Sequence, residues 1–227
     1  AGDAGREERK AVIHQTKSAW LQTLSSMDHE EDDPGTTWNA DARERDADLM
    51  SSRQAWRAIQ AGLPENAIIS SDIGNNCAIG NAYPTFEEGR KYLPPGLFGT
   101  CGYGFPAILG AKIGCPEVPV VGFAGDGAFG ISMNEMTSCG RDDWPAVTMV
   151  VFRNYQWGAE KRNSILWYDN NFVGTELNLD VSYAKIAQAC GLKGVQVTTQ
   201  ADLSAALQEA CAAQNDGVTT FIEVVLN

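Results

Sequence analysis

The sequence has few of the features that mark several common classes of protein. Among 227 residues there are only two histidines, and none of the six cysteines forms a CxxC pair. These absences argue against a zinc site and against a disulfide framework, which fits a reducing cytoplasm. No apolar run approaches the roughly 20 residues of a membrane span, and the first residues do not form a signal peptide. We therefore expect a protein of the cytoplasm that does not enter the membrane.

Positive charge is also scarce. The chain has 17 Lys and Arg residues against 29 Asp and Glu residues, with a formal net charge of -12. This balance argues against nucleic-acid binding through a basic surface, although a local basic cluster could still receive small anions. The segment GDGAFG differs from the GxGxxG dinucleotide motif because an acidic residue occupies its centre, where bare backbone is wanted, and the GxxxxGK[ST] motif is absent. A nicotinamide-binding domain or a nucleoside-triphosphate loop is therefore not favoured.

The sequence does contain a regular alternation of short apolar segments and helical patterns, and 44% of the residues are hydrophobic. Alternation of this kind predicts an α/β fold, a parallel sheet with helices on both faces. We expect strands at 66–74, 118–127, 146–154, 193–199 and 217–226, and helices at 51–63, 104–114, 131–141, 182–191 and 201–214.

The first 50 residues differ from the rest. They open with an amphipathic helical pattern and continue, over 28–48, as an acidic stretch with a Pro-Gly break. Composition favours a solvated linker there. We expect residues 1–50 to form an interdomain helix and linker, and residues 51–227 to form one domain. Because the first residue is not Met and lies within a helical pattern, we also expect a piece of a longer chain.

Two small oxygen-bearing side chains lie where predicted strands end. Asp126 follows one strand inside a GDG turn, and Asn154 ends the most apolar strand. Ligands of open parallel sheets bind beyond the carboxyl ends of the strands, where glycine-rich loops also allow close approach of backbone N–H groups to phosphate. Carboxylate and amide oxygens suit Mg²⁺, which is usually shared with phosphate oxygens. A GDG turn alone is ordinary turn chemistry, but the combination predicts a metal–diphosphate site.

The same segments carry a resemblance to a known family. A GDG turn followed after a little under thirty residues by Asn is typical of thiamine-diphosphate enzymes. The segment "GLFGTCGYGFPAILGAKIG" resembles that of the acetolactate synthase superfamily. Three other segments, "SDIGNNCAIGNAYP", "GDGAFGISMNEM" and "VVFRNYQWGAEKRN", resemble one family of that superfamily, the sulfoacetaldehyde acetyltransferases. This resemblance covers essentially the whole chain.

This resemblance implies a diphosphate-binding domain, the last of three domains in such enzymes, with thiamine diphosphate and Mg²⁺ as cofactors. It implies that Asp126 and Asn154 bind Mg²⁺ through their side chains and that Gln156 does so through its carbonyl oxygen. The cofactor-binding residues that it implies are Gly74, Asn75, Asn76, Gly99, Thr100, Cys101, Gly125, Gly127, Ala128 and Gly158.

Several roles stay open at this point. Cys101 replaces a bulkier Met of many relatives and is read as a small buried thiol rather than a redox group. Arg153 could face an anionic substrate or cap a strand end. Arg90, Lys91, Lys161 and Arg162 are further candidates for binding substrate anions, with a solvated surface position as the alternative for each. Trp157 and Trp167 are read as packing residues.

The implied reaction converts sulfoacetaldehyde and phosphate to acetyl phosphate and sulfite. The glutamate that activates the cofactor is expected in a pyrimidine-binding domain, on the same or a neighbouring subunit, so we expect a homo-oligomer. One alternative is an acetolactate-synthase-like enzyme that acts on another 2-oxo acid. Another alternative is a non-catalytic cofactor-binding subunit.

Overall fold

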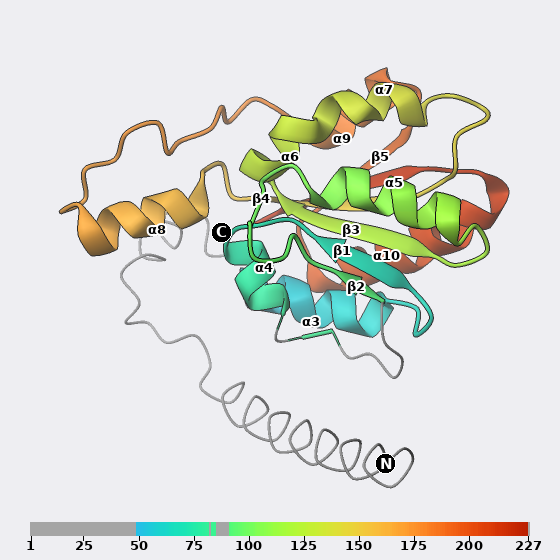
Figure 1. Ribbon diagram of the computed structural model, residues 1–227, viewed down its shortest axis with the longest axis horizontal. Helices are drawn as coiled ribbons and strands as arrows, with labels where there is room; N and C mark the ends of the chain where they lie inside the picture. Colours follow the sequence, from blue (N-terminus) through green and yellow to red (C-terminus); the bar gives the residue numbers. More distant parts are fainter. Residues whose placement is uncertain (1–48, 82, 85–90, 227) are drawn as a thin grey trace, which may run out of the picture. The chain divides into compact units, whose positions relative to one another are not determined.

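The centre of the computed structural model, which describes residues 49–81, 83–84 and 91–226, is a parallel sheet of six strands (Figure 1). All neighbouring strands run in the same direction, in the spatial order β2-β1-β3-β4-β6-β5. The strands are β1 (Ile68–Ser71), β2 (Tyr92–Leu93), β3 (Val120–Gly125), β4 (Thr148–Arg153), β5 (Lys193–Val197) and β6 (Thr220–Val225). The parallel α/β fold predicted from the sequence is confirmed.

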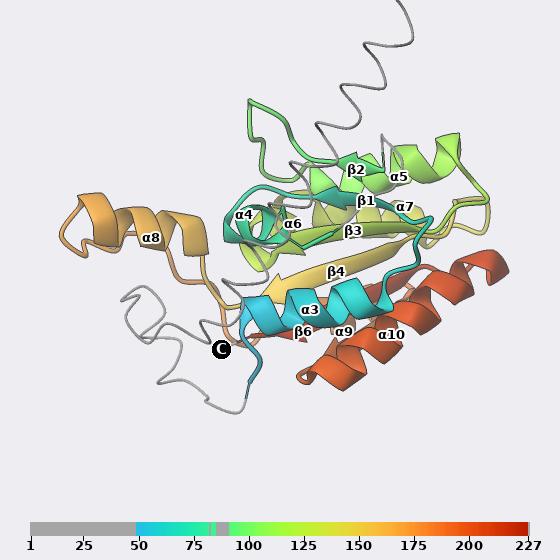
Figure 2. The ribbon, with the colours of Figure 1, turned by 90° about the horizontal axis from the view of Figure 1, so that it is seen from below.

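Helices cover both faces of the sheet (Figure 2). One face is covered by α3 (Ser52–Gly62), α4 (Asn75–Gly80) and α10 (Gln200–Ala213). The other is covered by α5 (Gly104–Gly114), α6 (Asp126–Ser132), α7 (Met136–Cys139) and α9 (Tyr183–Ala189). Two short 3-10 turns, η2 (Met133–Glu135) and η3 (Gln214–Asp216), extend α6 and α10.

Burial on both faces explains why the central strands β3 and β4 are mostly apolar. In β3, Val121 and Phe123 belong to the core beneath α3 and α10, whereas Val120 and Ala124 belong to the core beneath α5 and α9. Successive side chains of a strand point to opposite faces, so each strand contributes to two cores.

The connections after β1 and β3 leave the sheet on opposite faces. Ile79 of α4, which follows β1, packs against the first core, and Phe129 of α6, which follows β3, lies in the second. A crevice opens where neighbouring parallel strands send their chains to opposite faces. The carboxyl ends of β1 and β3 therefore flank the natural binding crevice of this sheet.

An aromatic group links the first core to this edge of the sheet. The ring of Trp56, on α3, lies 4.8 Å from the ring of Phe123 and 5.5 Å from that of Phe152, centroid to centroid. Trp56 is 1% exposed. Ser51 starts this helix with a capping box, in which its hydroxyl accepts from the N–H of Gln54 and the Gln54 side chain accepts from Ser51.

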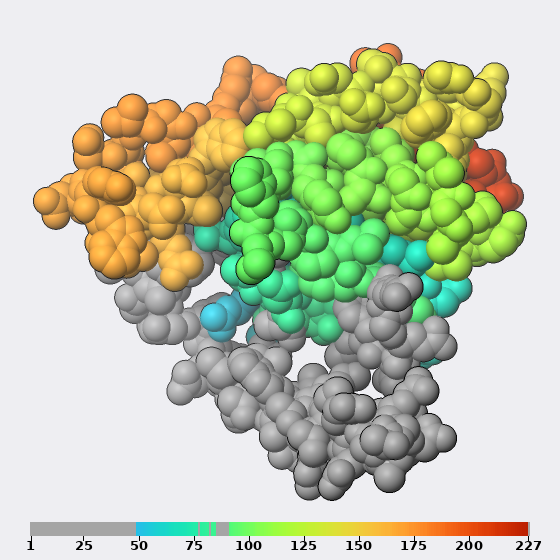
Figure 3. Space-filling model, viewed as in Figure 1, coloured from blue at the N-terminus to red at the C-terminus, as the bar shows by residue number. Residues whose placement is uncertain are grey.

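Helix α8 (Gly158–Trp167) projects from the body of the domain together with the residues that follow it, both orange in Figure 3. The base of this projection is closed by antiparallel backbone pairing. Trp157 donates to the carbonyl of Thr175 at 2.8 Å, and Leu177 donates to that of Tyr155 at 2.8 Å. The projection therefore begins beside the end of β4.

The sequence patterns located most elements but not all. Helix α5 and the helix predicted at 182–191 lie where expected, whereas α4, β2 and α8 were not predicted. The prediction of one helix at 131–141 is wrong, because α6 starts directly at Asp126 and the helix then breaks into η2 and α7. Gly125 is the N-cap of α6, so the GDG turn is the first turn of a helix.

The expected helix and linker of residues 1–50 lie almost wholly outside the described residues, and the domain boundary near residue 50 stays a prediction. Among the helices that the structure describes, none has the length and apolar content needed to cross a bilayer.

Replacing Trp56 tests the aromatic link. Trp56→Ala should lower the free energy of unfolding by about 3–5 kcal/mol, because it leaves a large cavity in the core. Urea unfolding followed by circular dichroism measures the change. The matched variant Trp56→Phe should cost much less, because the indole N–H is buried without a partner among the described residues. Equal losses in the two variants would contradict this view of the packing.

Candidate functional site

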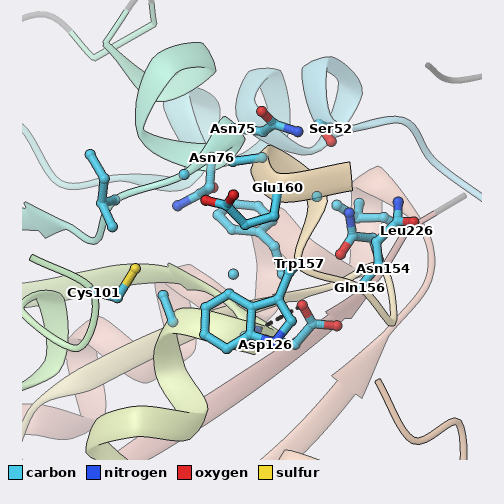
Figure 4. A pocket seen from close by; sticks show the side chains of 18 of the residues that line it. Ser52, Asn75, Asn76, Cys101, Asp126, Asn154, Gln156, Trp157, Glu160 and Leu226 are labelled. Carbon is cyan, nitrogen blue, oxygen red and sulfur yellow. Dashed lines mark hydrogen bonds between the residues drawn. The ribbon is translucent and has the colours of Figure 1, made fainter. Parts of the chain in front are cut away.

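A cavity of about 200 Å³ lies at the carboxyl ends of the central strands (Figure 4). Its walls come from the segments after β1, β3 and β4, from the loop before α5, and from the first turn of α8. The sequence-predicted residues that line it are Gly74, Asn75, Asn76, Gly99, Cys101, Gly125, Asp126, Gly127, Ala128, Asn154, Gln156 and Gly158. The crevice defined by the fold is thus a real cavity, and it brings most of the predicted site together.

Asp126 forms the polar floor of this cavity and is 2% exposed. Its Oδ1 accepts from the N–H of Gly127 at 3.0 Å, and its Oδ2 accepts from the N–H of Tyr155 at 2.7 Å. Burial raises the pKa of Asp126 to about 7, although the neighbouring N–H groups and Arg153 act to lower it. A cation in the cavity would favour the charged carboxylate that burial alone disfavours.

The side-chain amide of Asn154 and the carbonyl oxygen of Gln156 lie beside this carboxylate. The side-chain amide of Asn154 presents one terminal atom 3.3 Å from Oδ1 of Asp126 and 3.1 Å from the carbonyl oxygen of Gln156. With nitrogen at that position the amide would donate to both oxygens, and with Oδ1 there three acceptors face one another. Octahedral Mg²⁺ with ligands at about 2.1 Å requires adjacent oxygens about 3.0 Å apart. The spacing therefore fits three ligands of one Mg²⁺ ion.

The backbone at Tyr155 produces this convergence. Its φ of 63° lies in the left-handed region, which residues other than glycine seldom adopt. The turn lets the side chain of Asn154 and the carbonyl of Gln156 approach each other. Contacts on both sides hold Tyr155 in place, since its N–H donates to Asp126 and its carbonyl accepts from Leu177. Unusual backbone of this kind is concentrated at functional sites.

Glycines keep the walls of the cavity close to the backbone. A Cβ at Gly127 would lie 2.8 Å from the indole of Trp157, so only glycine allows that ring to rest on the GDG turn. Gly74 has a φ of 123°, and a Cβ there would meet no atom within 4 Å. Glycine is required at position 127 by packing and at position 74 by the backbone conformation.

Two buried polar groups of the cavity lack a partner among the described residues, namely Nδ2 of Asn76 and Oε1 of Gln156. An unpaired buried donor or acceptor is costly and is usually explained by a missing ligand, ion or water. Asn76 supplies a donor, as an anionic ligand requires. Together with the three converging oxygens, this donor fits the cavity to a metal–diphosphate.

Asp72 holds the loop that forms the opposite wall. This carboxylate is fully buried and accepts from the N–H groups of Ile73, Gly102 and Gly104 at 2.9, 3.0 and 2.7 Å. Burial raises the pKa of Asp72, while these hydrogen bonds oppose the rise. A Cβ at Gly104 would lie 3.0 Å from the N atom of Asp72, so loop and strand end pack closely. Asp72 thereby positions Gly99 and Cys101.

Arg153 does not line the cavity. Its Nη1 donates to Glu223 at 2.6 Å, its Nη2 donates to the carbonyl of Leu179 at 2.6 Å, and its guanidinium lies 4.4 Å from the ring centroid of Tyr155. Glu223 also accepts from Ser182 and from the N–H of Ala184. Of the two expectations for Arg153, this placement matches the one at a strand end, where the buried pair ties β4 to β6 and supports Tyr155.

The other predicted anion-binding side chains also lie away from the cavity lining. Lys161 is 3.0 Å from Glu176 and lies over the ring of Phe172, at the base of the projection. Arg162 and Thr100 are exposed and do not line the cavity. Arg90 lies outside the described residues, and Lys91 precedes β2. A substrate-binding role for Lys161 and Arg162 stays a prediction that this geometry does not support.

Sequence reasoning missed three residues of the site. Asp72 lies in the segment SDIGNN, but two of its hydrogen-bond partners are backbone N–H groups 30 and 32 residues away, which the sequence does not reveal. Trp157 was read as packing and lines the cavity, whereas Trp167, read in the same way, is 75% exposed. Glu160 lines the cavity from the first turn of α8. The sequence does show an acidic residue six positions after Asn154, but only the position of α8 reveals that this residue, Glu160, lines the cavity.

The Cys101 thiol lies in the cavity wall and is partly buried. Burial raises the pKa of the Cys101 thiol, and the carboxylates of Asp72 and Glu160 raise it further. A thiol that resists ionisation is a poor nucleophile, which favours the reading of Cys101 as a small wall residue.

Comparison with known proteins gives consistent results. Residues 72–224 match the family described as thiamine pyrophosphate enzyme, C-terminal TPP binding domain. The whole chain is 76% identical to a protein of Rhizobium meliloti (strain 1021) named probable sulfoacetaldehyde acetyltransferase, and 72% identical to a sulfoacetaldehyde acetyltransferase of Roseovarius nubinhibens. The chain spans 38% of the length of each of these relatives.

A solved structure shows the same fold. The thiamine diphosphate-dependent 4-hydroxybenzoylformate decarboxylase of Rhodococcus jostii RHA1 superposes on 79% of this chain, and on 33% of its own chain, with a TM-score of 0.71. The sequence identity is 24%, so this likeness concerns the fold. The α/β fold is thus that of the thiamine-diphosphate-binding domains.

The hydrogen bonds of Asp72 make a sharp prediction. Asp72→Asn should lower the free energy of unfolding by about 1–3 kcal/mol, because its amide nitrogen would face the N–H of Gly104. Urea unfolding measures the loss. The control Asp143→Asn removes a carboxylate from an exposed pair with Arg141 and should cost less than about 1 kcal/mol. A loss at Asp72 no larger than at Asp143 would refute the positioning role.

The buried pair predicts a different pattern. Arg153→Met should destabilise the domain by about 3–5 kcal/mol, because it leaves Glu223 buried without its cation. Adding Glu223→Gln to that variant should recover part of the loss, since no buried charge then remains at the site. Thermal and urea unfolding of the two single variants and the double variant test this. Strictly additive losses would contradict a coupled pair.

Proposed function

We propose, from the premise that this chain belongs to the thiamine pyrophosphate enzymes as their C-terminal TPP-binding domain, that the cavity holds the diphosphate of thiamine diphosphate through Mg²⁺. The close approach of the Asn154 side-chain amide to Oδ1 of Asp126, at 3.3 Å, and to the carbonyl oxygen of Gln156, at 3.1 Å, carries this proposal. Two diphosphate oxygens and a water would complete an octahedron. Asn75 and Asn76 lie at the start of α4, where side-chain amides and backbone N–H groups can donate to phosphate.

We further propose that the complete enzyme converts sulfoacetaldehyde and phosphate to acetyl phosphate and sulfite. The support is the name shared by two relatives that are 76% and 72% identical over the entire chain. When bound, thiamine diphosphate supplies a nucleophilic carbon that adds to the aldehyde carbon of the substrate. The residues of this chain bind the cofactor and orient it through the GDG turn and the loop at Gly99.

The proposal includes a second domain. The cavity described above fits the diphosphate end of the cofactor, and the group that activates the pyrimidine end would come from a pyrimidine-binding domain of the same or a neighbouring subunit. The chain covers 38% of the length of its relatives, which leaves room for such a domain in them. A homo-oligomer in the cytoplasm is part of this proposal.

A titration tests the metal–diphosphate site. Thiamine diphosphate should quench the fluorescence of the chain in the presence of Mg²⁺, because Trp157 lines the cavity, and chelation of the metal should reverse the change. Asp126→Asn should weaken binding at least tenfold, because a neutral amide replaces the only carboxylate among the three proposed ligands. Asp143→Asn is the control and should bind like the wild type. Metal-independent binding, or unchanged binding by Asp126→Asn, would refute the site.

A turnover assay tests the substrate. The assay uses a chain in which these 227 residues replace the matching segment of the Rhizobium meliloti relative. Sulfite should be released from sulfoacetaldehyde only when thiamine diphosphate and phosphate are both present, with one acetyl phosphate formed per sulfite. Acetolactate formation from pyruvate without sulfite release would instead support an enzyme acting on 2-oxo acids.

A further inference from the structure

Among the described residues that line the cavity, three have titratable side chains, namely Cys101, Asp126 and Glu160. Both carboxylate oxygens of Asp126 accept backbone hydrogen bonds at the cavity floor, where they fit a metal ion. Burial raises the pKa of the Cys101 thiol, which favours its protonated form over the thiolate. Glu160 is the remaining lining group that could both accept and donate a proton.

The position of Glu160 suits this task. It lies in the first turn of α8, and Figure 4 shows its carboxylate directed toward the side of the cavity that carries the Asn76 amide. Among the hydrogen bonds of the described residues, none is donated to this carboxylate, and the N-cap of α8, Trp157, makes no side-chain cap bond. Glu160 is exposed in this chain, so its carboxylate can reach a ligand in the cavity.

The proposed reaction requires two proton movements between neighbouring carbons. The aldehyde carbon of sulfoacetaldehyde must lose its hydrogen as a proton and gain a bond to a phosphate oxygen. The C–S bond breaks with its electron pair leaving on sulfite, and the methylene carbon gains a proton to become a methyl group. The proton of hydrogen phosphate leaves with hydrogen sulfite. One carbon is oxidised while its neighbour is reduced, so no external oxidant or reductant is needed.

We propose that Glu160 is a catalytic residue that takes the proton from the aldehyde carbon and delivers one to the neighbouring carbon. This inference rests on the proposed function, because the proton balance belongs to that reaction. One carboxyl group can perform both transfers in turn, since it is a base when ionised and an acid after it has accepted a proton.

A different role for Glu160 makes a distinct prediction. An acidic side chain in the first turn of a helix interacts favourably with the helix dipole. If that were its whole role, neutralising Glu160 would lower the stability of α8 and leave the rate of proton transfer unchanged. Rate, cofactor affinity and stability must therefore be measured on the same variants.

The experiment uses the holoenzyme in which these 227 residues replace the matching segment of the Rhizobium meliloti relative. Glu160→Gln should lower kcat for sulfite release by about 100-fold or more, the range expected for a general acid–base group. Its affinity for thiamine diphosphate with Mg²⁺, measured by tryptophan fluorescence, should stay within about threefold of the wild type. Glu160→Asp should restore part of the rate, because it keeps the carboxyl group on a shorter side chain.

The control is Glu117→Gln, which removes an exposed glutamate that does not line the cavity. It should leave rate and affinity unchanged. A kcat of Glu160→Gln within threefold of the wild type would overturn the proposal and leave the proposed function standing. A loss of cofactor affinity or thermal stability that accounts for the loss of rate would also overturn it. If the wild-type holoenzyme releases no sulfite, the proposed function fails and this inference fails with it.

Discussion

The structure of the site depends on the need to place three oxygens around one point at the end of a parallel sheet. Asp126 is 2% exposed, and burial raises its pKa to about 7, so a nearby cation would favour its ionised form. The side-chain amide of Asn154 lies 3.3 Å from that carboxylate and 3.1 Å from the carbonyl oxygen of Gln156. The proposed Mg²⁺ would account for both facts, because it would favour ionised Asp126 and would give the three oxygens a common partner.

The remainder of the domain supports this arrangement from two sides. The chains after β1 and β3 leave on opposite faces of the sheet, which opens the crevice. Asp72 then fixes the loop on one side of it through three backbone N–H groups. On the other side, the buried pair of Arg153 and Glu223 supports the left-handed turn at Tyr155. Two buried carboxylates that do not line the cavity, those of Asp72 and Glu223, thus help to position the residues that do.

The local patterns were sufficient to predict the parallel fold and the strand ends, because the central strands β3 and β4 are mostly apolar and Asp126 and Asn154 follow them directly. The patterns could not show which polar residues pair across the fold. Arg153 and Glu223 are 70 residues apart, and either a substrate-facing or a strand-end role suited Arg153 until their contact was known. Glu160 was missed for another reason. A glutamate after a strand has no special meaning until α8 is seen to begin beside the cavity.

The central claim is that the Asp126, Asn154 and Gln156 oxygens bind one cation together with a diphosphate. The most direct test is a crystal structure of the chain with thiamine diphosphate and Mn²⁺, using anomalous scattering to locate the metal. The account predicts one anomalous peak about 2.2 Å from the Asp126 carboxylate, the Asn154 side-chain oxygen and the Gln156 carbonyl, with diphosphate oxygens completing the octahedron. A cofactor bound with no metal at this point, or with the Asn154 amide nitrogen facing Asp126, would contradict it.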